Sequence, residues 1–226
     1  CVHTRSGKKR VALDAKNYYA NTVWCLSQAQ IESDTNMLLQ LQQQLTDIYQ
    51  VDRAHDIRDF LITDRQQANC LGQNVLLENT DETLLVAQDD DGLELSLFLD
   101  GEMLTRLEAA GPMACLHSEL LGDWWTVIEG ISHFNCVAWK ASQDRTVTLL
   151  ELELQGEIDK FVSTMMIAME QSNSELMSGL HGRLFEGFNF HEGLDDEQLE
   201  RYRSANDYAS RYCHALRQKL IDDHQL

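Results

Sequence analysis

Strict alternation of apolar and polar positions marks one part of the chain as a β-hairpin. Leucine fills every second position of residues 93–99, which is the two-residue period of a strand with one buried face. Residues 83–88 form a second run rich in Leu and Val, and three aspartates and Gly92 separate the two runs. Asp and Gly favour tight turns, and Gly92 can supply a positive φ, so the pattern predicts an antiparallel hairpin. The short apolar run 59–64 predicts one further strand.

Elsewhere apolar residues recur three and four positions apart, which is the period of an amphipathic helix. The pattern predicts helices over 35–50, 102–110, 123–141, 147–169 and 174–185 and from Asp195 onward, with a weaker one over 18–29. The pair Gly111-Pro112, which holds the single proline, predicts a break after residue 110.

The predicted helix 147–169 has an apolar stripe that we expect to face the core. The stripe places Glu153 and Glu157 beside the core face, toward its boundary or toward solvent. Its members are Val147, Leu150, Leu154, Ile158, Phe161, Met165 and Ala168.

These elements predict an α+β fold that is mostly helical. We expect a small antiparallel β-hairpin or sheet in the N-terminal half and an antiparallel helical bundle in the C-terminal half. Residues 1–16 are basic and lack apolar periodicity, so they are expected to be an exposed arm, either unstructured or foreign to the natural chain. Residues 17–226 are expected to form a single α+β domain, with a helix and small sheet over 17–100 and a helical part over 101–226.

The chain is strongly acidic, with a formal net charge of −19 over 226 residues. Residues 1–16 carry +4, so the remainder carries −23, and −15 of this falls within 78–159. Such a field repels nucleic-acid phosphate and anionic membranes and favours basic protein surfaces, although it can also serve only to keep the protein in solution. No apolar run approaches the length of a membrane span. We therefore expect neither nucleic acid nor membrane as a partner.

The six cysteines are scattered without a Cys-x-x-Cys pair. A chain of this length has no need of disulfide staples, so a reducing, cytoplasmic location is favoured. The sequence contains neither a nucleotide-binding glycine loop nor a Gly-x-Ser-x-Gly nucleophile motif.

One constellation has the residue types of a metal site. Glu129 and His133 are four residues apart, so they share a face of the predicted helix 123–141. If this helix packs antiparallel to the next one, Glu153 and Glu157 lie at the same heights. Carboxylate sites in four-helix proteins bind iron or manganese with inward-facing Glu and His, and the group is partly like that plan. It departs from the plan because the usual Glu-x-x-His spacing is three residues.

The alternative for this group is structural. Glu157 and Lys160 would then form an ion pair along their helix, and His133 would be a hydrogen-bonded histidine at the boundary of the core.

The last predicted helix holds an Arg- and Tyr-rich surface within an acidic protein. Arg and Tyr are favoured at binding hot spots, so we expect a partner-binding surface there, although the arginines can also neutralise acidic neighbours within the chain. The residues are Arg201, Tyr202, Tyr208, Arg211 and Tyr212.

The leading hypothesis is a non-enzymatic, acidic intracellular protein that binds other proteins or its own copy, with no cofactor. The alternative is a metal-dependent enzyme that uses iron, manganese or zinc on Glu129, His133, Glu153 and Glu157. The sequence identifies no catalytic residue and no biological process.

Overall fold

The fold is α+β and mostly helical, as predicted. It is seen in a computed structural model that describes residues 2–6, 28–53, 55–72, 80–89, 92–116, 120–187 and 195–223. The chain forms two compact units, Cys1–Thr146 and Val147–Leu226. The expectation of one domain over residues 17–226 stays a prediction. None of the helices in the described ranges is both long and apolar enough to cross a membrane.

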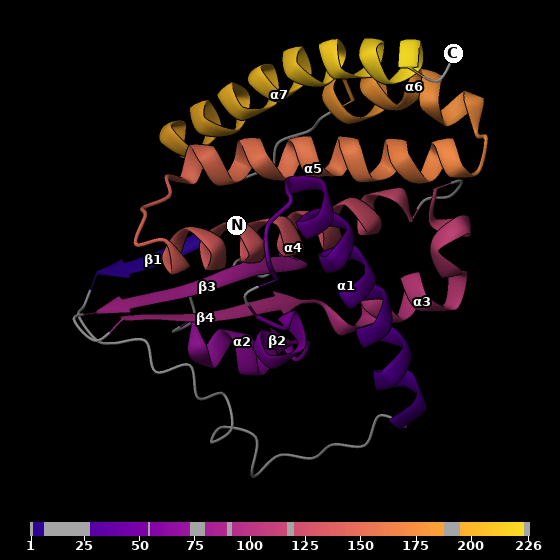
Figure 1. Cartoon of the computed structure of the whole chain (residues 1–226). Helices are drawn as coiled ribbons and strands as arrows, with labels where there is room; N and C mark the ends of the chain where they lie inside the picture. Colours follow the sequence, from indigo (N-terminus) through magenta and orange to yellow (C-terminus); the bar gives the residue numbers. More distant parts are fainter. Residues whose placement is uncertain are drawn as a thin grey trace. The chain divides into compact units, whose positions relative to one another are not determined.

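The first unit is organised around a four-stranded mixed sheet with the order β1-β3-β4-β2 (Figure 1). The strands are β1 (Val2–Ser6), β2 (Leu61–Ile62), β3 (Glu82–Asp89) and β4 (Gly92–Leu99). β3 and β4 pair antiparallel in the centre, and β1 and β2 each add a parallel strand at an edge. The sequence pattern did not predict β1, which was expected to belong to the exposed arm, because Val2 is its one apolar residue.

The central hairpin confirms the strongest sequence prediction. Asp89 pairs with Gly92, and Gly92 has a φ of 141°, in the region that glycine adopts without strain. The strand predicted over 59–64 is much shorter than expected. A 3-10 helix, η2 (Ile57–Phe60), occupies its start, with Asp56 capping the Arg58 amide, and only Leu61–Ile62 pairs with β4.

In the described part of the first unit, four α-helices accompany the sheet: α1 (Gln28–Tyr49), α2 (Arg65–Leu71), α3 (Gly101–Cys115) and α4 (Leu121–Ser142). Helix α1 begins earlier than predicted, since neither Gly nor Pro interrupts residues 28–35. The helix predicted over 18–29 lies mostly outside the described residues. Helix α3 contains the predicted break, because Gly111 is non-helical, with φ 72° and ψ 159°.

Two helices cover opposite faces of the sheet (Figure 1). Phe98 packs with Ala68 of α2, while its neighbours Leu97 and Leu99 point to the other face, toward α4. α4 approaches closely at Gly130, where an added Cβ would lie 3.0 Å from the Leu99 side chain. The absence of a side chain at this position therefore sets the distance between the helix and the sheet.

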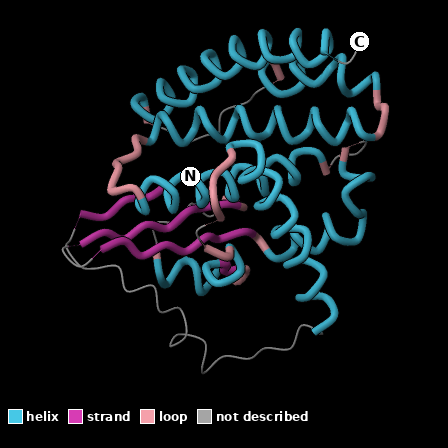
Figure 2. The backbone as a smooth tube through the Cα atoms, viewed as in Figure 1, coloured by secondary structure: helices cyan, strands magenta, loops and turns pink. Residues whose placement is uncertain are grey.

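The second unit is a bundle of α5 (Leu149–Glu170), α6 (Ser174–Phe185) and α7 (Asp196–Asp223) (Figure 2). Polar side chains cap the N-termini of α5 and α7. Thr148 and Glu151 form a capping box on α5, and Asp195 accepts from the Gln198 amide at 2.7 Å, as predicted for the start of the last helix. α6 runs antiparallel to α7, because His181 contacts Ser210 whereas Phe185, later in α6, contacts Asn206, earlier in α7.

The predicted core stripe of α5 is correct in its C-terminal half and wrong in its N-terminal half. Phe161, Met165 and Ala168 are buried, whereas Leu150 is exposed and Leu154 and Ile158 are only half-buried. In the first part of the helix the buried residues are instead largely polar or charged. They are Leu152, Glu153, Gly156, Glu157, Asp159 and Lys160.

Candidate functional site

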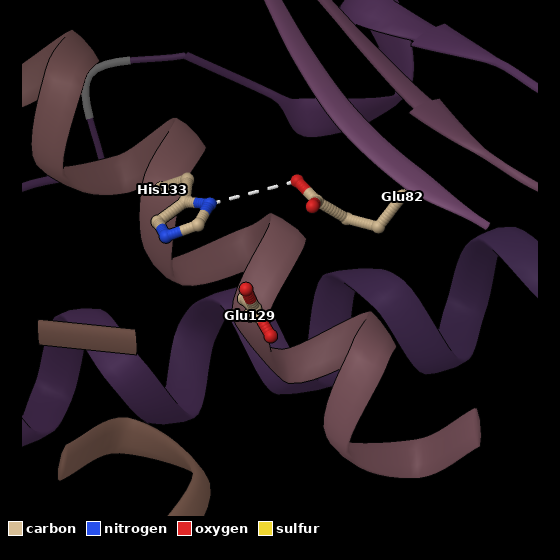
Figure 3. Close-up of side chains that lie close together, drawn as sticks. All are labelled: Glu82, Glu129 and His133. Atoms are coloured by element: carbon tan, nitrogen blue, oxygen red, sulfur yellow. Dashed lines mark ion pairs between the residues drawn. The ribbon is translucent and has the colours of Figure 1, made fainter. Parts of the chain in front are cut away.

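A group of two glutamates and one histidine lies where α4 crosses the sheet (Figure 3). Glu82 comes from the first position of β3, and Glu129 and His133 come from successive turns of α4. One potential ligand atom from each side chain lies within 4.8 Å of the other two. We call Glu82, Glu129 and His133 the carboxylate–histidine cluster.

The local fold explains why these side chains meet. The spacing of four residues puts Glu129 and His133 on the same side of α4. On β3, Glu82 shares a sheet face with Leu84, and Glu82 pairs across the hairpin with Leu99. A Cβ on Gly130 would lie 3.0 Å from the Cγ of Glu82, so the glycine lets the helix descend onto the strand that carries this carboxylate.

The cluster is largely shielded from solvent. The His133 side chain is 0% exposed and the Glu82 side chain 5%, and Glu129 is half-buried. The His133 Nδ1 lies 3.5 Å from the Glu82 Oε1, the pair joined by a dashed line in Figure 3. Burial acts to raise the pKa of Glu82 and the charge of Glu129 adds to this effect, whereas a protonated His133 would act to lower it.

The donor set fits a divalent transition metal. Carboxylate oxygen and imidazole nitrogen bind zinc, manganese and iron at about 2.1 Å, so two donors on one ion are at most about 4.2 Å apart. The donors here lie within 4.8 Å of one another, so side-chain movements of less than about an ångström bring them to coordination distance.

Two of the four residues in the sequence-based metal hypothesis belong to this cluster, namely Glu129 and His133. Glu153 and Glu157 lie in the second unit, on α5, and that they join the other two stays a prediction. Each has a basic neighbour there. Glu157 accepts from the Lys160 Nζ at 2.6 Å, as the structural alternative predicts, and Glu153 lies 3.9 Å from the Arg201 Nε.

Sequence reasoning missed Glu82, and a signal for it existed. In the predicted hairpin the positions of Glu82 and Leu84 share one face, so a carboxylate stands on the face that the leucine buries. A charged residue at the end of a buried strand face is a candidate ligand. His133 was expected at the boundary of the core, but it is completely buried.

The five predicted partner-binding residues do not share one environment. Arg201 is mostly buried against Glu153, and its guanidinium lies over the ring of Tyr202, 5.4 Å from the ring centre. Tyr208 and Tyr212 are 54% and 55% exposed. Arg211 is also exposed and pairs with Asp207 of the preceding turn at 2.8 Å.

A serine and a histidine also meet in the second unit, but they do not form an activated nucleophile. The His181 Nε2 lies 2.9 Å from the Ser210 carbonyl oxygen and 3.3 Å from the Ser210 Oγ. Hydrogen bonding to the carbonyl requires a proton on Nε2, so this nitrogen cannot accept the proton of the serine hydroxyl at the same time. The pair therefore joins α6 to α7 structurally.

No protein-family model matches the sequence, and the comparisons with curated proteins and with solved structures likewise find no match.

Proposed function

We propose that this protein binds a divalent transition metal ion at the carboxylate–histidine cluster. The observation that carries the proposal is the convergence of Glu82, Glu129 and His133, from two elements far apart in sequence, to within 4.8 Å at their ligand atoms.

Charge supports this proposal. With a neutral imidazole the three side chains together carry a formal charge of −2, and two of them are buried. Like charges this close in a shielded place are costly, and an ion of charge +2 balances them. The metal also requires a neutral histidine, which keeps a lone pair for coordination.

The donor types favour zinc, manganese or iron over magnesium and calcium. Calcium takes six to eight oxygen ligands, and magnesium keeps most of its water, whereas a buried imidazole suits the transition metals. The cluster combines two hard carboxylate ligands with one imidazole and contains no soft thiolate, so it suits metal ions of intermediate softness. We therefore expect binding of Zn²⁺, Mn²⁺ and Fe²⁺ to exceed that of Mg²⁺.

The proposed role of the ion is to tie α4 to β3. Its ligands come from one helix and one strand, so bound metal cross-links two elements of the first unit. Glu129 is the half-buried member and marks the side from which an ion or water enters. A catalytic use of the metal, the alternative from the sequence, would require a substrate to reach the ion from this same side.

The test starts from protein stripped of metal with a chelator. Titration calorimetry and thermal unfolding are then measured with Zn²⁺, Mn²⁺ and Mg²⁺. We expect one site per chain, and at free metal 100-fold above Kd a stabilisation of about 2.7 kcal/mol.

Variants distinguish metal binding at this site from nonspecific attraction of cations to an acidic protein. Glu82→Gln and His133→Gln are expected to weaken binding by at least about tenfold, whereas Glu94→Gln, at an exposed position of β4, serves as the charge-matched control. Glu153→Gln tests whether the residues of the second unit take part. Equal binding by Glu82→Gln and Glu94→Gln would overturn the proposal, as would a lack of any saturable binding.

A second candidate function is the protein interaction expected from the sequence, and the exposed tyrosines of α7 support it. We also retain a reducing, cytoplasmic location as a proposal, supported by Cys70 and Cys213, neither of which forms a disulfide.

A further inference from the structure

The outward face of α7 carries a row of exposed side chains at helical spacing. Tyr208 and Tyr212 are more than half exposed, although large apolar surface of this kind is usually covered. We call this row the outer stripe. Its members, all exposed, are Glu197, Tyr208, Arg211, Tyr212, Ala215 and Lys219.

Packing within the second unit fixes the direction of this stripe. Ala205, Ala209 and Cys213 follow one another at every fourth position on another face of α7, and each is at most 1% exposed. Their small size allows α5 and α7 to pack closely. The helix cannot turn to bury its tyrosines without exposing these residues.

Charge is distributed unevenly along α7 and the residue that caps it. Residues 195–200 carry four acidic side chains and no basic one, a net charge of −4. Residues 201–219 carry five basic side chains and Asp207, a net charge of +4. The helix therefore has an acidic start and a basic middle, before Asp222 and Asp223 at its end, and its acidic start can lie opposite Lys219 of a second copy in the reversed direction.

We propose that the outer stripe is a self-association surface that packs antiparallel against the outer stripe of a second copy of this chain. Such a contact has two-fold symmetry, in which one surface meets itself. With the symmetry axis at Tyr208, Glu197 of each copy lies opposite Lys219 of the other. The tyrosines then lie in the middle of the contact, where apolar anchors contribute most to binding.

Other occupants fit this surface less well. A parallel arrangement of two copies places like charges together along the whole helix. A polyanion such as nucleic acid is attracted by residues 201–219 but repelled by residues 195–200 and by a chain of net charge −19. In an antiparallel pair, Glu197 at one end of each stripe lies opposite Lys219 at the other end of its partner.

The size of the contact sets the expected affinity. The 23 residues from Glu197 to Lys219 extend about 33 Å along the helix. One helix face of this length buries less than the roughly 1,600 Å² of a standard interface. We therefore expect a dimer that dissociates in the micromolar range.

Sedimentation equilibrium of the full chain, at 5 to 500 µM and 150 mM salt, tests the proposal. We expect the wild-type protein to change from monomer to dimer within this range, and Tyr208→Ser with Tyr212→Ser to raise the dissociation constant at least tenfold. Glu197→Lys and Lys219→Glu are each expected to weaken the dimer, and their combination to restore it, because the swapped charges again face each other.

A matched control is the exposed pair Glu175 and Arg183 of α6, whose charge reversal should leave association unchanged. Circular dichroism of each variant establishes that α7 remains helical. A wild-type chain that stays monomeric at 500 µM overturns the proposal. So does a dimer that folded single variants leave intact, or one that the charge swap fails to restore.

Discussion

Two groups of buried charged side chains, one in each compact unit, balance their charge in different ways. In the second unit two buried glutamates have a permanent cation beside them, since Glu157 pairs with Lys160 and Glu153 lies near Arg201. In the carboxylate–histidine cluster two glutamates lie beside one histidine. Lysine and arginine stay charged at neutral pH, whereas a histidine changes its charge readily.

This difference separates a structural ion pair from a candidate binding site. A glutamate matched by a lysine is already neutralised, so it gains little from an added cation. Two carboxylates and a neutral imidazole carry a formal charge of −2 and offer the donor types that a divalent transition metal binds. The kind of partner, more than the number of buried acids, indicates where an ion would bind.

Removing the ammonium group of the buried Glu157–Lys160 pair should have the largest effect on stability. Lys160→Met leaves Glu157 buried without the ammonium group 2.6 Å away, so we expect a loss of about 3 to 5 kcal/mol. Urea unfolding followed by circular dichroism measures it. Glu157→Leu added to this variant should recover most of the loss, because no buried charge remains at that pair.

An exposed ion pair provides the control for this prediction. Arg183→Met removes the cation from Glu175, whose side chain is 89% exposed, and should change stability by less than about 1 kcal/mol. Equal losses of unfolding free energy for Lys160→Met and Arg183→Met would show that burial of the Glu157–Lys160 pair does not affect its contribution to stability.

The next largest effect is expected at the glycine that brings α4 onto the sheet. Gly130→Ala places a methyl group 3.0 Å from the Glu82 and Leu99 side chains, so the helix or the strand must shift, at about 1 to 3 kcal/mol. Gly122→Ala on the same helix meets no atom within 4 Å and should be neutral or stabilising by up to about 1 kcal/mol.

Comparing the two alanine variants by thermal unfolding checks this prediction. Metal titration of Gly130→Ala sharpens it, because a displaced α4 should also weaken binding at the cluster. Identical stabilities for the Gly130→Ala and Gly122→Ala variants would contradict the close approach.

The smallest effect should appear at alkaline pH in the second unit. Burial, followed by the charges of Glu157 and Asp159, raises the pKa of the Cys213 thiol from 9.0 to about 12. Between these values the unfolded thiol ionises while the folded one stays neutral, so this group stabilises the unfolded state as pH rises. We expect a loss of about 1 kcal/mol at pH 10 relative to pH 7.

Because tyrosine and lysine also titrate at high pH, the measurement compares wild type with Cys213→Ala. The wild-type curve of unfolding free energy should fall more steeply from pH 8 to pH 10. Parallel curves would show that the thiol titrates alike in both states.

The sequence predicts those parts of the fold that depend on local patterns. The hairpin, the break at Gly111 and the helix start at Asp195 are all confirmed, because turn geometry and capping act within a few residues. Strand β1 was missed, because it is held by parallel pairing with β3, more than 70 residues away. No local periodicity records such a partner.

The sequence predicted only part of the candidate site, because local patterns do not record contacts between distant elements. Glu129 and His133 share one helix, so their spacing was visible, whereas Glu82 reaches them only through the packing of α4 on the sheet. In α5 the apolar pattern chose the wrong face over its first turns. Glu153 and Glu157 can be buried because a basic residue lies beside each of them. A hydrophobicity scale scores a glutamate only as polar, so the pattern predicts that it is exposed.

The order of strands in the sheet has a consequence for how the first unit folds. Asp89 pairs with Gly92, so only two residues separate the paired ends of the central strands β3 and β4. The parallel edge strands require longer closures: each residue of β2 lies 36 residues before its partner in β4, and the partners in β1 and β3 are further apart still. Closing long loops costs chain entropy before any contact is gained, so we expect the hairpin to form early and the edges to join later.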